Sequence, residues 1–278
     1  MYKDTDELRK DIAKYTASLG EKFNGADGKR YIMLCGGTGC LAAGTLNLKA
    51  SLEELIKKNN LEDKVAIRQV GCFGMCSQGP FIRIYPEDRL YRMVKVEDIE
   101  EVVEKDLLKG ETVERLLYED PKTGKKISKL EDIPYYQKQK RIALHGCGVI
   151  DPNKIEEALG CGGYQGLLNA LNMTPQEVVD MILASGLRGR GGGGFPTGRK
   201  WQFAHDQQSD EKYVVCNGDE GDPGAFMDRS VLEDNPLAVI EGMAIAGYAI
   251  GASEGYFYIR AEYPTAVARI KATIAKAE

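Results

Sequence analysis

The 278-residue sequence has no long hydrophobic run and no excess of basic charge. Its longest apolar stretch, residues 237–252, is interrupted by Glu241 and is shorter than the roughly 20 residues that cross a bilayer. Residues 1–15 are charged throughout, which excludes a secretory signal or a membrane anchor there. Because 37 basic residues stand against 42 acidic ones, nothing in the composition attracts nucleic acid or anionic lipid. We therefore expect a cytoplasmic protein with no nucleic acid partner and no direct membrane insertion.

Seven cysteines and 32 glycines stand out in this otherwise globular composition. The cytosol keeps thiols reduced, so cysteines there are more often metal ligands or catalytic groups than disulfides. The glycine content is 32/278, about 11.5%, against a usual value near 7%. Such an excess indicates tight turns, or close approaches of the main chain to a ligand. The spacing of these two residue types therefore points to the chemistry.

Apolar periodicity indicates an α/β chain whose first part opens with an amphipathic helix at residues 5–19, expected to end at Gly20. A small two-layer domain follows. We place its boundaries at residues 29–118, after an N-terminal helical segment at 1–28. Its expected elements are a strand at 31–35, a helix through Leu48, Leu52, Leu55 and Ile56, a strand at 64–70, a hairpin of 80–85 with 89–94, and a helix at 96–108.

Residues 119–141 are polar and rich in lysine, without a sustained apolar period, and we interpret them as a linker. The second part, residues 142–278, alternates helices and strands as parallel sheets do. Two strands are too few to bury both faces of such a sheet, so we expect a truncated chain. Its expected elements are helices at 155–159 and 175–185, the latter with a capping box of Thr174 and Glu177, strands at 212–216 and 256–260, and helices from Pro236 and Pro264.

Four cysteines occur as two pairs beside the expected strands. Cys35 and Cys40 are separated by four residues, and Cys72 and Cys76 by three. Loops at one end of adjacent strands would bring the four thiolates together, and the neighbouring glycines supply backbone freedom and N–H donors. Four thiolates suit either iron–sulfur or zinc. Structural zinc sites usually use closer pairs, so the spacing favours a diiron cluster, with zinc and reduced structural thiols as the alternatives.

The motif CGGTGC, followed by GCFGMC and GPFIRIY, resembles the thioredoxin-like 2Fe2S ferredoxins that are fused to flavoprotein subunits. The resemblance covers residues 29–110 and differs from the plant-type ferredoxin spacing. It implies that the four paired cysteines hold a 2Fe2S cluster. The remaining cysteines share no ligand spacing, and we expect them to be buried small side chains: Cys147, Cys161 and Cys216.

Residues 186–201 form a glycine-dense loop. It contains a literal GxGxxG at Gly189, Gly191 and Gly194, but the element before it is expected to be a helix, whereas the dinucleotide fingerprint follows a strand. Consecutive glycines still allow backbone N–H groups to approach a planar or phosphorylated ligand. A flexible hinge is the alternative. Positive charge and flat rings are supplied by Arg190, Arg199, Lys200, Phe195 and Phe203.

An acidic loop follows the strand YVVC and carries Asn217, Asp219, Glu220 and Asp222. Ligands of open α/β sheets bind beyond the carboxyl ends of the strands, where this loop lies. Carboxylates repel phosphate, so ribityl hydroxyls, ring N–H groups or a carboxamide are the expected partners. A divalent metal site and a solvated turn are the alternatives.

The glycine loop and the acidic loop together resemble the flavoprotein subunit of respiratory complex I. With the ferredoxin region in front, the chain is more similar to the beta subunit of NAD(P)-dependent, often electron-bifurcating, iron-only hydrogenases, or of related formate dehydrogenases. This implies an α/β fold with a thioredoxin-like ferredoxin domain followed by an incomplete FMN-binding α/β domain. The resemblance assigns cofactor binding to Gly189, Arg190, Gly191, Gly192, Gly193, Gly194, Phe195, Gly198, Lys200, Phe203, Asn217, Asp219, Glu220 and Asp222.

The same resemblance implies an NAD(P)H:acceptor oxidoreductase subunit that passes electrons between NAD(H) or NADP(H), FMN and iron–sulfur clusters. Hydride passes directly to the flavin, so no catalytic side chain is assigned. The implied partners are other iron–sulfur subunits of a hydrogenase or dehydrogenase. A 4Fe4S cluster is expected only in a family segment beyond Glu278. The alternative is a non-catalytic 2Fe2S electron carrier or docking fragment without bound flavin.

Overall fold

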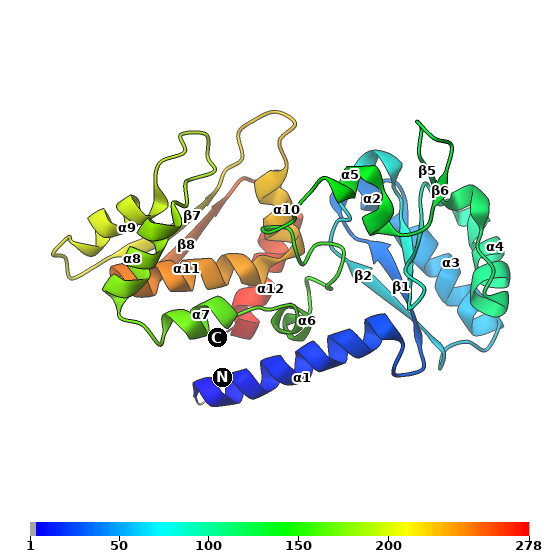
Figure 1. Cartoon of the computed structure of the whole chain (residues 1–278), viewed down its shortest axis with the longest axis horizontal. Helices are drawn as coiled ribbons and strands as arrows, with labels where there is room; N and C mark the ends of the chain where they lie inside the picture. The colour runs from blue at the N-terminus through cyan, green and yellow to red at the C-terminus, as the bar shows by residue number, and fades with distance from the viewer. Residues whose placement is uncertain (1–3, 278) are drawn as a thin grey trace. The chain divides into compact units, whose positions relative to one another are not determined.

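The computed structural model describes residues 4–277, which divide into two compact units (Figure 1). The first consists of residues 13–161 and 233–235 and contains the four paired cysteines. We call it the cysteine unit. The second consists of the other described residues and contains the glycine loop and the acidic loop. We call it the glycine unit.

The cysteine unit is built on a four-stranded mixed sheet with the order β2-β1-β3-β4. Parallel pairing of β1 with β2 aligns Cys35 with Val70, so the loops after both strands start at the same edge of the sheet. The expected hairpin is confirmed by the antiparallel pairing of β3 with β4. The strands are β1 (Arg30–Cys35), β2 (Val65–Val70), β3 (Ile82–Tyr85) and β4 (Arg89–Tyr91).

Both faces of this sheet are covered. Helix α3 (Thr45–Lys58) places Leu48, Leu52 and Ile56 in one core with Ile32 of the central strand, as the spacing of those residues predicted. The opposite face holds a second core, to which residues far apart in the sequence contribute. The short elements of this unit are α2 (Thr38–Ala42), η1 (Cys76–Gln78), η4 (Glu114–Leu116) and α6 (Ile155–Gly160).

The helix expected at residues 96–108 is helical but is not one α-helix. It consists of a 3-10 turn η2 (Val96–Asp98), a short α4 (Ile99–Glu101) and a π-helix η3 (Val102–Leu107). The wide turns contain Asp106, whose fully buried carboxylate pairs with two arginines and with the hydroxyl of Tyr91. A periodicity of apolar residues cannot distinguish a π-turn that holds a buried charge from an ordinary helical turn.

The N-terminal helix does not end at Gly20. Helix α1 (Thr5–Asn24) continues through that glycine, and the left-handed residue that follows its end is Gly25, with φ of 71°. Phe23 lies in the extra turn and stacks on Tyr85 at a ring-centroid distance of 4.7 Å. This contact offsets the cost of about 1 kcal/mol for an interior glycine.

The polar segment at residues 119–141 contains more structure than its composition indicated. It includes the hairpin β5 (Tyr118–Glu119) and β6 (Lys126–Ile127), the 3-10 turn η5 (Leu130–Asp132) and α5 (Pro134–Gln137). Leu130, Ile133 and Tyr136 are buried in the second core of the cysteine unit. Three apolar side chains spaced three apart are therefore enough to fix this segment to the sheet.

The glycine unit alternates helices with two parallel strands, as the sequence predicted (Figure 1). The capping box is confirmed, because Thr174 accepts from Glu177 N–H while Glu177 accepts from Thr174 N–H. No helix within residues 4–277 has the length and apolarity needed to cross a membrane. The elements are α7 (Gln165–Ala170), α8 (Pro175–Ser185), α9 (Thr197–His205), β7 (Tyr213–Gly218), α10 (Met227–Asp234), α11 (Pro236–Ile250), β8 (Glu254–Ile259) and α12 (Pro264–Ala277).

The β7–β8 sheet has one covered face and one open face. Cys216 and Phe257 of the covered face pack with Ile270 of α12. The other face presents Tyr213, Val215, Tyr256 and Tyr258, whose exposed fractions run from 46% to 62%. Parallel sheets are ordinarily buried on both faces, so this surface is unusual for its strand type.

Candidate functional site

The four paired cysteines lie together in the cysteine unit. The thiol of Cys35 interacts electrostatically with the thiols of Cys40 and Cys72, and the Sγ atoms of Cys72 and Cys76 are 3.7 Å apart. The four thiols therefore form one interacting series, with Cys35 and Cys72 in the middle. Cys35 and Cys40 are fully buried, whereas Cys76 is exposed. The group thus has a protected side and a side that faces solvent.

Glycines keep the space beside these sulfur atoms free. A Cβ added at Gly79 would lie 2.5 Å from Sγ of Cys40, and one added at Gly37 would lie 3.2 Å from Sγ of Cys72. The N–H of Gly74 donates to Sγ of Cys72 at 3.3 Å. Soft sulfur donors, open space and an N–H donor to sulfur are what an iron–sulfur cluster requires of its binding loops.

The electrostatics of the group favour a bound cation. A hydrogen bond with Cys40, together with burial, raises the pKa of the Cys35 thiol to about 12, and a hydrogen bond with Cys35 likewise raises the pKa of Cys72 to about 12. Deprotonation therefore needs the positive charge of bound metal. Within residues 4–277, no group of three or more His, Cys, Asp or Glu side chains has the arrangement that would hold a metal ion. The sulfur series fits a binuclear cluster, whose ligands are divided between two irons.

The glycine loop is a closed hairpin with an open tip. Arg188 and Pro196 form an antiparallel bridge, and the N–H of Gly189 donates to the carbonyl of Phe195 at 2.9 Å. At the tip, a Cβ added at Gly191 or Gly193 would meet no atom within 4 Å. The bare main chain of the tip is therefore accessible to a flat ligand.

The aromatic residues predicted beside this loop lie close to each other. Phe195 and Phe203 are about half exposed, with ring centroids 6.5 Å apart and an interplanar angle of 47°. The guanidinium of Arg199 lies 5.9 Å from the centroid of the Phe203 ring. Lys200 belongs to the same helix, α9, which begins at Thr197, so the predicted loop of residues 186–201 is helical from that residue on. The loop therefore carries exposed rings and positive charge beside an open main chain, as expected.

Gly198 has a different environment from the other glycines of the loop. It is buried in α9, and a Cβ added there would lie 2.5 Å from the backbone nitrogen of Leu183 in α8. The absence of a side chain at Gly198 therefore allows α8 and α9 to pack closely. This requirement gives Gly198 a structural role in addition to the cofactor contact predicted for it.

The acidic loop divides into exposed and buried carboxylates. Asn217, Asp219 and Asp222 are exposed, and Oδ1 of Asn217 accepts from the N–H of Asp219 at 3.0 Å. The carboxylate of Glu220 is instead buried, with 7% of the residue exposed. The loop follows β7 directly, and Figure 1 shows it and the glycine loop extending from the same side of the β7–β8 sheet. The exposed members are thus the ones positioned to meet a ligand.

Glu220 caps the first turn of α10. Its carboxylate accepts from the N–H groups of Asp228 at 3.0 Å and Arg229 at 3.3 Å, and from the hydroxyl of Tyr263 at 3.0 Å. Burial opposes ionisation, but these hydrogen bonds outweigh it and lower the pKa of Glu220. Arg260 donates to the backbone carbonyl of the same residue. The sequence suggested a ligand contact for Glu220 and gave no signal for Arg260 and Tyr263, which fix the loop.

Replacing Glu220 with glutamine should lower the free energy of unfolding by roughly 1–3 kcal/mol at neutral pH, because the amide brings N–H groups toward N–H donors. The pKa of Glu220 is lowered in the folded chain, so its contribution is present above about pH 4.3, the ordinary value of a glutamate, and is lost on further acidification. Urea unfolding at pH 7 and at about pH 3 measures both effects. The exposed Glu211→Gln is the control, with an expected change within about 0.5 kcal/mol; equal stabilities of the two variants would contradict the capping role.

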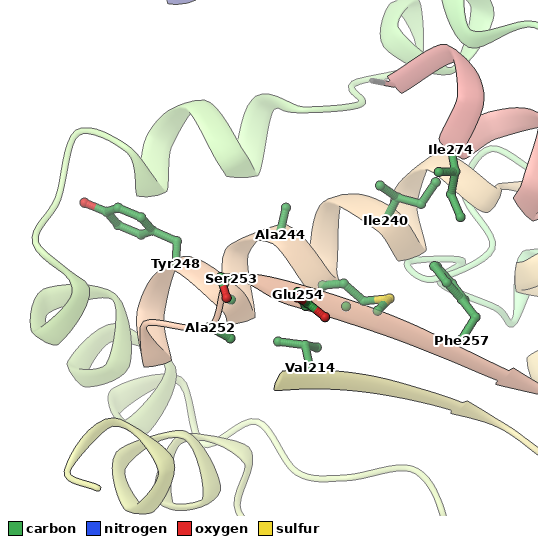
Figure 2. Close-up of a pocket in the computed structure, with 12 residues that line it drawn as sticks. Val214, Ile240, Ala244, Tyr248, Ala252, Ser253, Glu254, Phe257 and Ile274 are labelled. Carbon is green, nitrogen blue, oxygen red and sulfur yellow. The ribbon is translucent and has the colours of Figure 1, made fainter. Parts of the chain in front are cut away.

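A separate cavity of about 280 Å³ lies between α11 and the strands β7 and β8. Figure 2 shows Ile240, Phe257 and Ile274 at one end of it, and Tyr248 and Ser253 at the other. None of the residues predicted to bind a cofactor lines this cavity. The predicted site is therefore an accessible loop surface of the glycine unit, outside this cavity.

Two segments of this chain match known protein families. Residues 21–106 match the thioredoxin-like 2Fe-2S ferredoxin family, and residues 182–278 match the Nuo51 FMN-binding domain family. These matches confirm the predicted fold class and the order of its two domains. They include the four paired cysteines in the first region, and the glycine and acidic loops in the second.

Two curated relatives match half of the chain or less. The NADP-reducing hydrogenase subunit HndC of Solidesulfovibrio fructosivorans is 59% identical over 138 residues, which are 50% of this chain and 28% of that protein. An NADH-quinone oxidoreductase subunit of Aquifex aeolicus is 54% identical over 112 residues, 40% of this chain and 26% of that protein. A crystal structure of the thioredoxin-like 2Fe-2S ferredoxin of Aquifex aeolicus, 32% identical, covers 32% of this chain and 94% of its own, with a TM-score of 0.30. The chain spans less than a third of the length of the two curated relatives.

Proposed function

We propose that this chain passes electrons between a nicotinamide nucleotide, FMN and iron–sulfur clusters. Its residues 21–106 match the thioredoxin-like 2Fe-2S ferredoxin family, and its residues 182–278 match the Nuo51 FMN-binding domain family. One observation carries this proposal. The same chain gathers four interacting cysteine thiols and, in its second unit, a glycine loop with a bare, accessible main chain.

The function requires a converter, because a nicotinamide nucleotide gives up two electrons as a hydride whereas an iron–sulfur cluster accepts one at a time. FMN supplies that conversion when it is bound. The chain's own residues bind the nucleotide and the flavin and orient them. The tip of the glycine loop offers N–H groups, Phe195 and Phe203 offer flat surfaces, and the exposed acidic-loop residues Asn217, Asp219 and Asp222 accept hydrogen bonds from hydroxyl or ring N–H groups. The transfer of hydride between two bound rings needs no acid or base from the protein.

Cys35, Cys40, Cys72 and Cys76 are the ligands proposed for the 2Fe-2S cluster. Burial of Cys35 and Cys40 shields one side from water, whereas the exposed Cys76 brings the opposite side to the surface. Electrons can enter or leave over that exposed side. The names of the relatives, a hydrogenase subunit and a quinone oxidoreductase subunit, support an assembly of several subunits. We propose that further iron–sulfur subunits belong to it. We propose a cytoplasmic location for this assembly.

A second function is favoured by one contrast between the units. The sheet of the cysteine unit is covered on both faces, whereas the β7–β8 sheet has an open face. A chain in which only the cysteine unit binds its cofactor would be a 2Fe-2S electron carrier or a docking module.

Analysis of iron, acid-labile sulfide, zinc and FMN in the anaerobically reconstituted chain separates these functions. The proposed function predicts two irons, two sulfides and one FMN per chain, as the two families imply. Iron and sulfide without FMN would support the carrier. Zinc in place of iron would contradict both.

A further inference from the structure

Three consecutive polar residues, Glu233, Asp234 and Asn235, belong to the cysteine unit although they are distant in sequence from its sheet. Their exposed fractions are only 4%, 1% and 6%. Carboxylates are seldom buried to this extent without a specific partner. The proposed function leaves this segment without a role.

Helix stability does not explain the two acidic residues. Glu233 and Asp234 are the last residues of α10, which has no basic residue in its last turn. The dipole of a helix disfavours negative charge at this end. Their position therefore reflects contacts outside the helix.

Both carboxylates accept hydrogen bonds from the loops that follow β1 and β2 and carry the paired cysteines. Oδ2 of Asp234 accepts from the backbone N–H of Cys72 at 2.9 Å. A Cβ added at the neighbouring Gly71 would lie 2.7 Å from Cβ of Asp234, so the close approach depends on that glycine. Oε2 of Glu233 accepts from the hydroxyl of Thr38 at 2.9 Å, two residues before Cys40. Each loop is thus held by one carboxylate.

We propose that Asp234 is a positioning residue that lowers the reduction potential of the cluster held by the four cysteines, and that Glu233 assists it. This inference rests on the proposed function, since it requires the cluster. Reduction adds one negative charge to the cluster, and a carboxylate bonded to the main chain of a ligand opposes that charge at short range and in a partly buried setting. Asp234 also accepts the hydrogen bond of the Cys72 N–H group. That N–H group is then not available to donate to a cluster sulfur and stabilise the reduced state.

The test is a spectroelectrochemical titration of the anaerobically reconstituted chain, following the electron paramagnetic resonance signal of the reduced cluster. Asp234→Asn keeps an oxygen acceptor and removes the charge. We expect its reduction equilibrium constant to rise roughly tenfold, which is about 59 mV more positive for a one-electron couple. Glu233→Gln should shift the potential in the same direction by less, because Glu233 acts through a hydroxyl group. Glu53→Gln is the matched control, since it removes a half-exposed charge of the same unit from α3 and should leave the potential unchanged.

The reduction potential and the iron content of each variant decide whether Asp234 affects the potential or has a purely structural role. A cluster whose potential is the same in Asp234→Asn as in the parent chain overturns the inference, and so does an equal shift in Glu53→Gln. If Asp234→Asn loses iron, the reduction potential of the cluster in Glu233→Gln becomes the test. A more positive potential in that variant supports the proposal. Loss of iron from both variants would overturn the effect on potential in favour of a purely structural role. A parent chain that binds no iron and sulfide would instead overturn the proposed function.

Discussion

Replacing Gly193 with alanine is expected to weaken FMN binding about tenfold or more while leaving the melting temperature unchanged. Gly193 has no atom within 4 Å of the position of an added Cβ, and its φ is not in the left-handed region, so the methyl group costs the folded chain nothing. A flat ring lying on the main chain would be pushed away, and such overpacking costs roughly 1–3 kcal/mol. Titration of FMN fluorescence and thermal unfolding measure the two properties separately.

Gly198→Ala is the companion variant, and here we expect the stability of the chain to fall. Its Cβ would lie 2.5 Å from the backbone of Leu183, so we expect a loss of roughly 1–3 kcal/mol in stability. The pair separates contact with the cofactor from packing of the loop. Unchanged FMN affinity in Gly193→Ala would show that the ring does not lie on the tip of the glycine loop.

Replacing Cys35 with alanine is expected to abolish the 2Fe-2S cluster. Cys35 is fully buried and interacts with the thiols of both Cys40 and Cys72, so its removal breaks the series in the middle. No water can replace the missing ligand without entering the closed side of the group. Iron and sulfide analysis, with the visible spectrum of the reconstituted chain, measures the loss.

Cys216→Ala serves as the control for the loss of a thiol. Cys216 is partly buried in β7 of the glycine unit and shares no contact series with the four paired cysteines. We expect parent amounts of iron and sulfide in this variant. A Cys35→Ala chain that retains both irons would contradict the proposed ligand set.

The sequence alone was sufficient for features that depend on local spacing. The parallel strands β1 and β2, the β3–β4 hairpin and the capping box at Thr174 follow from apolar period and turn chemistry. The juxtaposition of the four cysteines follows from parallel pairing, because both loops start at the same edge of the sheet. These predictions needed no knowledge of distant contacts.

Features that depend on distant contacts were not predictable in this way. Helix α1 passes Gly20 because Phe23 finds Tyr85, which lies about 60 residues further along the chain. Glu220 resembled its exposed neighbours in sequence, yet it caps α10 because Tyr263 and the helix N-terminus converge on it. Asp234 carried no signal, since its partner Cys72 is 162 residues away.

Anaerobic titration of the reconstituted chain with NADH, followed by visible and electron paramagnetic resonance spectroscopy, tests whether electrons pass from the nucleotide through FMN to the cluster. We expect loss of the flavin absorption band together with the appearance of a reduced 2Fe-2S signal, and the latter should be absent from Cys35→Ala. A chain that holds both cofactors but shows no cluster signal after NADH has been added would contradict the proposed function.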